Sequence, residues 1–179
     1  AEPEIEEFTV LKFKRGDVIY PAATLRPETV FGVTNMWLNP DTLYVQIKVD
    51  DENWLVSSEA ANKIKFLGRD VETVDEILGA KLIGGTLTNP MTGAEIPILP
   101  ASFVDPKNAT GIVMSVPAHA PFDYVALEQL KNGPKEVFDR FGLRPTEMAK
   151  LNPISLIELP GWGESPAVDI VEKMGITDQ

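Results

Sequence analysis

Turn-forming residues interrupt this sequence at short intervals. Fifteen prolines and thirteen glycines are spread over 179 residues, and most of the prolines lie between apolar stretches. Because proline breaks helices internally and cannot donate to a β-ladder, each apolar stretch should form a short element. Many stretches are rich in β-branched and aromatic residues, which favours strands. The sequence therefore predicts an α+β (mixed) fold: a compact, β-barrel-like core of short strands with peripheral helices.

Individual elements follow from periodicity and from start and stop signals. The expected strands are 8–14, 18–23, 43–49, 54–56, 81–87, 96–99 and 111–116. The expected helices are 60–66, 73–78, 121–130, 135–141 and 167–174, with capping signals at Ser57 and Ser165. Gly84 and Gly85 suggest a bulge or bend, and the nearly continuous apolar strand 111–116 is expected to be central. The acidic residues 1–7 are expected to fray.

Composition restricts the class of protein. The chain has 27 acidic and 16 basic residues and a net charge of -11, which disfavours a surface that binds nucleic acid by general electrostatics. An RNA partner should therefore engage locally, as a single-stranded end entering a pocket. The absence of cysteine excludes disulfides, thiolate zinc sites and a cysteine nucleophile. No apolar run reaches the ~20 residues that span a bilayer, so no membrane-spanning helix is expected. We expect a cytoplasmic, monomeric domain over 1–179 that is excised from a longer protein.

The first candidate site segment, residues 24–29, reads TLRPET. A strand should end at Thr24, and Pro27 predicts the start of a short helix. In one interpretation Thr24 caps that helix, Glu28 complements its dipole and Arg26 is a solvated cation. In the other, backbone N–H groups, threonine hydroxyls and Arg26 surround a polar substrate, because helix N-termini bind anions and developing oxyanions.

The second candidate segment, residues 114–123, reads MSVPAHAPFD. It leads from an apolar strand through a proline-rich loop to a helix with Asp123 in its first turn, where an acid also stabilises the helix dipole. His119 is the only histidine, so a histidine metal pair is excluded, and we expect it to be neutral and to hold the loop by hydrogen bonds. No carboxylate cluster has metal-binding spacing, so no metal is expected. Ser115 lacks the Gly-x-Ser-x-Gly context of a serine hydrolase.

Together the two segments resemble a known family. AATLRPETVFGVTNMWLNP followed by ATGIVMSVPAHAPFDYVAL is similar to the editing (connective-peptide) domain of class I aminoacyl-tRNA synthetases for leucine, isoleucine and valine. TLRPET with PAHAPFD resembles leucyl enzymes of the archaeal and eukaryotic cytosolic type, whereas isoleucyl and valyl relatives usually carry Thr-Pro-Trp-Thr over 26–29. Synthetase ATP-binding signatures are missing from the sequence. The resemblance therefore implies an editing domain without synthetic activity, and ATP and Mg²⁺ would serve only the synthetic site of a parent enzyme.

The resemblance implies roles around the amino-acid part of a substrate. Asp123 matches the aspartate that pairs with the α-ammonium group of the misattached amino acid. Thr29 matches the threonine that crowds the γ-branch of leucine and so excludes Leu-tRNA. Met114 and Val116 match residues that line the amino-acid pocket.

The resemblance also implies contacts with the rest of the substrate. Thr24 and Arg26 match positions around the terminal adenosine and the scissile ester, and with Asp123 they form the expected catalytic set. Leu25 departs from bacterial relatives, which carry a second threonine there, and Ala120 departs from the many relatives with aspartate. Further substrate contacts are expected from Leu25, Ser115, His119 and Phe122.

The implied reaction is post-transfer editing, in which water hydrolyses the ester of tRNA(Leu) charged with isoleucine, valine or norvaline. One methylene separates related amino acids by only ~1–3 kcal/mol, a figure that comes from synthetases themselves, so a second hydrolytic site multiplies selectivity. The expected partners are the 3′ end of the mischarged tRNA and the rest of the synthetase. The alternatives are an isoleucyl or valyl editing domain, a non-catalytic insertion that docks tRNA or a partner protein, and a small-molecule esterase.

Overall fold

The structure is a computed structural model that describes residues 8–157 and 163–178, so the segment 1–7 predicted to fray lies outside it. The strands are β1 (Thr9–Arg15), β2 (Val18–Thr24), β3 (Asn35–Leu38), β4 (Leu43–Val49), β5 (Glu52–Ser57), β6 (Val71–Leu78), β7 (Thr86–Thr88), β8 (Glu95–Pro100) and β9 (Ile112–Ser115). The helices are α1 (Ser58–Phe66), α2 (Pro121–Lys131), α3 (Lys135–Phe141), α4 (Pro145–Met148) and α5 (Pro166–Met174), with 3-10 turns η1 (Pro27–Gly32) and η2 (Gly79–Lys81).

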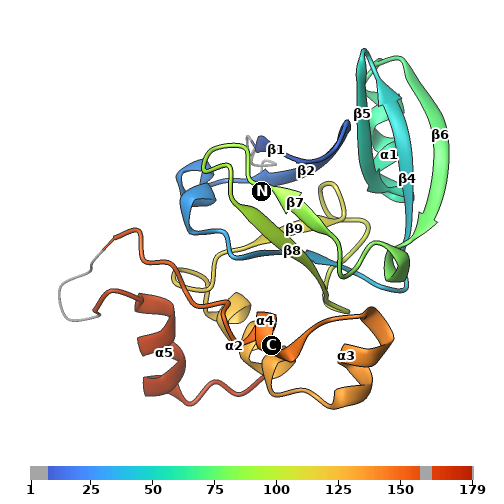
Figure 1. Cartoon of the computed structure of the whole chain (residues 1–179). Coiled ribbons are helices and arrows are strands. Elements are labelled where there is room, and N and C mark those ends of the chain that lie inside the picture. Colours follow the sequence, from blue (N-terminus) through green and yellow to red (C-terminus); the bar gives the residue numbers. More distant parts are fainter. Residues whose placement is uncertain (1–7, 158–162, 179) are drawn as a thin grey trace, which may run out of the picture.

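The strands form one curved sheet in the order β6-β4-β5-β2-β1-β7-β8-β3-β9. The sheet curls so that β9, at one end, lies beside β2. Strands β2, β1, β7, β8, β3 and β9 thus enclose a small barrel-like core, while β4, β5 and β6 project from it with α1 on one face (Figure 1). This arrangement confirms the predicted α+β fold with a barrel-like core of short strands.

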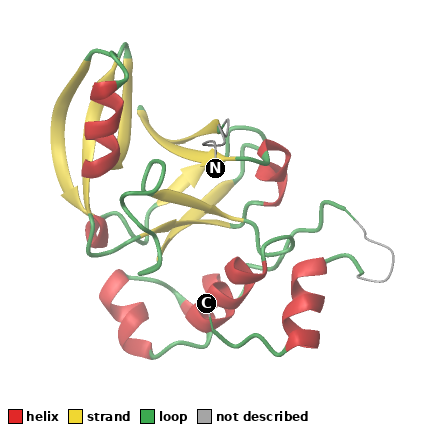
Figure 2. Cartoon of the chain, turned by 180° about the vertical axis from the view of Figure 1, so that it is seen from behind, coloured by secondary structure: helices red, strands yellow, loops and turns green. Residues whose placement is uncertain are grey.

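Helices α2 to α5 gather at the opposite end of the barrel from the β4–β6 layer (Figures 1 and 2). Three of them were predicted almost to the residue, and α1 begins as expected because the Ser57 hydroxyl accepts a hydrogen bond of 3.0 Å from the N–H of Ala60. At the Ser165 capping signal, by contrast, no side-chain cap bond forms. Within the described ranges, every helix is too short or too polar to cross a bilayer.

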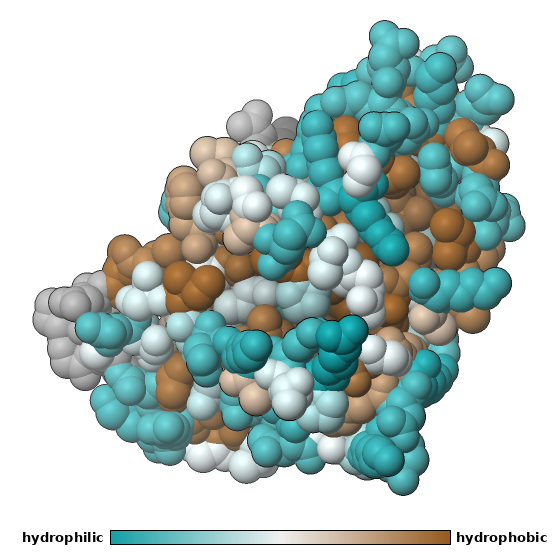
Figure 3. All heavy atoms as spheres, viewed as in Figure 1, coloured by the Kyte–Doolittle hydropathy of each residue, from teal (hydrophilic) through white to brown (hydrophobic). Residues whose placement is uncertain are grey.

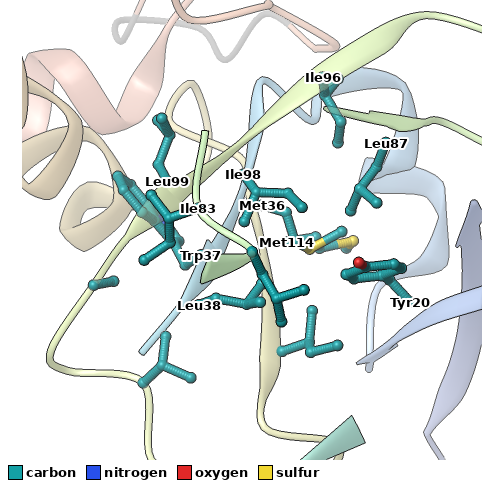
Figure 4. Packing of buried hydrophobic residues seen from close by; sticks show 14 of the residues in the cluster. Tyr20, Met36, Trp37, Leu38, Ile83, Leu87, Ile96, Ile98, Leu99 and Met114 are labelled. Carbon is teal, nitrogen blue, oxygen red and sulfur yellow. The ribbon is translucent and has the colours of Figure 1, made fainter. Parts of the chain in front are cut away.

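Hydrophilic residues cover much of the surface, above all the β4–β6 layer (Figure 3), while the barrel interior is apolar. All four residues of β3 are buried, and Met36 lies opposite Met114 of β9 in register. Figure 4 shows the two methionines together in this core. Strand β3 is not predicted from the sequence, because its NMWL stretch is short and flanked by polar residues. A second, smaller core lies between α1 and β4–β6.

Residues 73–78 form a strand, so the predicted helix is wrong. They belong to β6, which pairs antiparallel along the whole of β4, from Leu43 opposite Leu78 to Val49 opposite Val71. A six-residue helix gains few internal hydrogen bonds and is marginal alone. The ladder with β4 satisfies the same backbone groups, and the β-branched residues of this stretch suit a strand.

Two further expectations for the sheet are corrected. Strand β9 lies at the end of the hydrogen-bonded order, and Val113 is 39% exposed, so this apolar strand is not central. The predicted strand 81–87 is reduced to the three residues of β7. Gly84 has a φ of +84° and bends the chain before β7, and a Cβ there would lie 2.6 Å from the carbonyl oxygen of Phe141. The sequence predicted either a bulge or a bend at the glycine pair, and the structure has a bend.

Candidate functional site

The two candidate segments line one cavity. It has a volume of about 370 Å³ and lies between the end of β2, the start of η1, β9 and the loop before α2. Eight of the ten predicted site residues line it: Thr24, Leu25, Arg26, Thr29, Met114, Val116, His119 and Asp123, together with Phe8, Ala23, Val113 and Ala120. Segments about ninety residues apart in the sequence meet here because β9 lies beside β2.

The first wall is the chain from the end of β2 into η1. Arg26 donates its backbone N–H to the Thr24 hydroxyl at 3.1 Å, and the buried Thr29 donates its hydroxyl to the Arg26 carbonyl at 2.7 Å. The Arg26 guanidinium contacts Glu28 at 3.1 Å, with both side chains well exposed. Arg26 itself occupies the N-cap position, without a side-chain cap bond. Thr24 therefore stabilises the turn before η1, and the helix-cap interpretation of Thr24 is wrong.

The second wall is the loop between β9 and α2. The N–H groups of His119 and Ala120 both donate to the Val116 carbonyl, at 3.0 and 2.9 Å, and so form a tight turn. Pro121 then begins α2, as predicted, because proline needs no partner for a missing N–H at a helix start. This turn places the first-turn carboxylate of Asp123 back over the end of β9.

Asp123 is held by two donors that come from outside its own helix. The backbone N–H of Val116 donates to Oδ2 at 2.8 Å, and the indole N–H of Trp37 donates to Oδ1 at 3.2 Å. Burial raises the pKa of Asp123 to about 6, and the hydrogen bonds from Val116 and Trp37 oppose that rise. Its carboxylate thus belongs to the cavity wall, and the dipole interpretation alone does not account for it.

His119 has the structural role that the sequence predicts. Its Nε2 accepts a hydrogen bond of 3.1 Å from the backbone N–H of Leu156. Burial, with a smaller contribution from the Arg26 charge, lowers its pKa, so the imidazole is neutral near pH 7. The ring also lines a neighbouring apolar cavity of about 270 Å³, with Phe31, Leu156 and Ile157. His119 thereby ties the loop before α2 to the segment that follows α4.

Two predicted substrate contacts lie outside the cavity. Ser115 is fully buried opposite Asn35 of β3, whereas its neighbours Met114 and Val116 line the cavity. Phe122 is 56% exposed and points away, because one residue along a helix turns the side chain by about 100°. The structure adds Trp37, which donates a hydrogen bond to Asp123 and was not among the predicted site residues. The only hint in the sequence is the tryptophan itself, because an indole N–H needs an acceptor when the ring is buried.

Across the parts of the chain that the structure describes, no three histidine, aspartate or glutamate side chains cluster as metal ligands. The chemistry available to the cavity is that of one carboxylate, one guanidinium, one imidazole, two threonine hydroxyls and an apolar lining.

The fold matches solved structures of synthetase editing domains. The structure described as GlLeuRS-CP1 superposes with a TM-score of 0.84 at 27% identity, over 95% of this chain and 78% of that one. The editing domain of the P. falciparum cytosolic leucyl-tRNA synthetase has the same fold, with a TM-score of 0.81 at 24% identity over 90% of this chain and 61% of that one. The fold is therefore that of a synthetase editing domain.

Sequence similarity identifies the particular family of editing domains. The profile of the "Leucyl-tRNA synthetase, editing domain" family matches residues 9–139. The leucine-tRNA ligases of Pyrococcus abyssi and Methanosarcina acetivorans are 53% and 50% identical over 98% and 99% of this chain. The chain belongs to the leucyl-tRNA synthetase editing-domain family. It spans about a fifth of the length of these curated relatives, 19% and 18% respectively.

Proposed function

We propose that this domain hydrolyses the ester bond of mischarged tRNA(Leu) in the cavity between β2 and β9, as part of a leucine-tRNA ligase. The observation that carries the proposal is the cavity's two-sided chemistry. A carboxylate lies on one wall, and threonine and arginine side chains lie on the other. An aminoacyl ester has matching parts: an ammonium group, a side chain and a ribose ester.

Asp123 would bind the α-ammonium group. Each of its oxygens accepts one internal hydrogen bond, which leaves lone pairs on both for a ligand. An ammonium group beside a partly buried carboxylate replaces lost hydration and favours the ionised form. Such a contact is worth about 1.5–3 kcal/mol. Asp123 thus supplies the orientation of the amino acid in the cavity.

Thr29, Met114 and Val116 would select the amino-acid side chain. All three are buried and line the cavity. The hydroxyl of Thr29 is tied to the Arg26 carbonyl, which restricts the rotation of this side chain. A rigid wall can exclude a γ-branched side chain that a flexible wall would accommodate. Isoleucine, valine and norvaline would then be hydrolysed while leucine is rejected.

Water would be activated mainly by orientation and electrostatic stabilisation. The Thr24 hydroxyl accepts from the Arg26 N–H, and the Thr29 hydroxyl donates to a carbonyl, so neither contacts a general base as an activated nucleophile does. The His119 Nε2 lone pair is occupied by the N–H of Leu156. Direct attack of a positioned water on the ester fits these contacts better than a covalent intermediate does. The proposed reaction uses neither ATP nor a metal.

The 3′ end of the tRNA would be the nucleic-acid contact. Arg26 is 59% exposed at the rim of the cavity and carries the charge that a terminal nucleotide needs. The overall charge of -11 limits further contacts by this domain. The rest of the ligase would therefore supply most of the affinity for tRNA.

The test is deacylation of Ile-tRNA(Leu) by the intact ligase with Asp123→Ala. Loss of the ammonium contact should lower kcat/KM about 10- to 100-fold. Asp169→Ala is the matched control, because Asp169 also lies in the first turn of a helix that begins with proline but does not line the cavity. Full activity of Asp123→Ala would contradict the proposal, as would complete loss of wild-type activity on treatment with EDTA.

A further inference from the structure

Trp37 is the residue that connects the barrel core to the proposed site. It is 1% exposed, and the residues of β3 around it pair with β8 on one side and β9 on the other. Its ring packs edge-on against Phe103 at 5.7 Å between centroids and borders a second cavity of about 410 Å³ on the side of α2 and α3. It is absent from the lining of the site cavity, yet its single polar atom reaches the Asp123 carboxylate.

The two donors to Asp123 come from rigid parts of the fold. The N–H of Val116 follows directly on β9, and the indole N–H of Trp37 is fixed by the packing of β3 between two strands. A carboxylate held through both oxygens has one orientation, whereas one held through a single oxygen can rotate about its χ2 angle, which is soft for aspartate. Trp37 therefore supplies the contact that sets the plane of the carboxylate.

We propose that Trp37 is a positioning residue for the editing reaction: its indole N–H orients the Asp123 carboxylate and keeps it ionised to receive the substrate ammonium. This inference rests on the proposed function of Asp123. Trp37 itself touches neither the ester nor the amino acid, so its effect on the reaction passes entirely through Asp123.

Few other groups influence the ionisation of this carboxylate. From the first wall, Arg26 faces the cavity but contacts Glu28, and from the loop before α2 the neutral His119 faces it. The pKa of Asp123 is raised by burial and lowered by the bonds from Val116 and Trp37. Removing the indole N–H should therefore favour the protonated acid, which cannot pair with an ammonium group.

The variant Trp37→Phe keeps an aromatic ring in the core and removes the N–H. In the intact ligase we expect the acidic limb of the kcat/KM profile for Ile-tRNA(Leu) deacylation to move up by about one pH unit. The ratio of wild type to variant should be about fivefold larger at pH 6 than at pH 8.5, where Asp123 is ionised in both proteins and the remaining defect comes from lost orientation. Titration of the substrate cancels in this ratio, because both enzymes act on the same ester.

Trp54→Phe is the matched control. The Trp54 indole N–H donates to the Glu52 carboxylate at 2.9 Å, a bond of the same kind in β5, outside the cavity. This variant should match wild type at every pH. A Trp37→Phe defect that is equal at all pH values would mean a purely structural role and would overturn the inference. Activity that is retained by Asp123→Ala would instead refute the proposed function, so the two failures are distinct.

An NMR titration of the unmodified 179-residue chain tests the same contact without relying on a core variant. The ¹⁵N–¹H indole resonance of Trp37, assigned by its loss in Trp37→Phe, should shift with a midpoint near the Asp123 pKa of about 6. The Trp54 resonance should shift below pH 4.5, because hydrogen bonds from Lys12 and Trp54 lower the pKa of Glu52. A Trp37 resonance that stays unchanged between pH 5 and 7 would overturn the inference.

Discussion

Ionisation of Asp123 should reduce the stability of the folded domain, and substitution by asparagine isolates that effect. Burial raises the pKa of this carboxyl from 3.8 to about 6. At 1.36 kcal/mol for each pKa unit, the ionised form is disfavoured in the fold by about 3 kcal/mol. Between pH 4 and 6 the unfolded chain has released the proton while the folded chain retains it, so the free energy of unfolding falls as the pH rises. The stability contribution is complete below pH 3.8 and is lost as the pH passes about 6.

Urea unfolding of the chain, followed by circular dichroism from pH 4 to 8, measures this effect. Asparagine at position 123 has no proton to lose, and it can accept from only one of the two donors, Val116 or Trp37. That lost bond is a constant offset at all pH values. The free energy of unfolding of Asp123→Asn minus that of wild type should therefore increase by about 3 kcal/mol between pH 4 and pH 8. The same difference for Asp169→Asn should not change in this way.

A flat difference across this pH range would refute the reasoning, because it would mean that the folded carboxyl is as well solvated as in the unfolded chain. A decrease would mean that Trp37 and Val116 stabilise the ionised form by more than burial disfavours it. The expected increase has a functional meaning. A carboxylate that destabilises the empty site is stabilised when an ammonium group arrives, so binding energy is concentrated on the correct substrate group.

The remaining predictions concern exclusion and packing. Thr29→Ala should raise the rate of Leu-tRNA(Leu) hydrolysis by at least about 10- to 200-fold, the factor for one methylene, because it removes both the methyl and the hydroxyl group of Thr29. Thr29→Val, which keeps the shape but loses the bond to the Arg26 carbonyl, should reject leucine better than Thr29→Ala does. An Ala variant that rejects leucine as well as wild type does would place the exclusion elsewhere. Gly79→Ala should lower the free energy of unfolding in urea by about 2–3 kcal/mol, since its Cβ would lie 2.1 Å from the Asn39 carbonyl oxygen. Gly93→Ala, where nothing lies within 4 Å, should cost only about 1 kcal/mol, and equal losses would contradict this packing argument.

Local chemistry made several features predictable. The β1–β2 hairpin, the Ser57 cap and the start of α2 at Pro121 depend on residues within a few positions of each other, and all three occur as expected. The segments at 24–29 and 114–123 were identifiable as one site because their resemblance to a family does not require knowing how they pack. The hydrogen-bonded role of His119 was also expected, because a single histidine in a loop most often holds that loop.

Long-range packing accounts for the rest. Residues 73–78 have a weak local preference, and their pairing with β4 made them a strand. The contact from Trp37 to Asp123 joins residues 86 positions apart, so periodicity and motifs contain no trace of it. Ser115 is buried opposite Asn35 of β3 and outside the cavity, because which residues of β9 face β2 depends on how the sheet curls. Motifs carry the chemical groups of the site, whereas the closure of the barrel sets which groups face the cavity and what holds them.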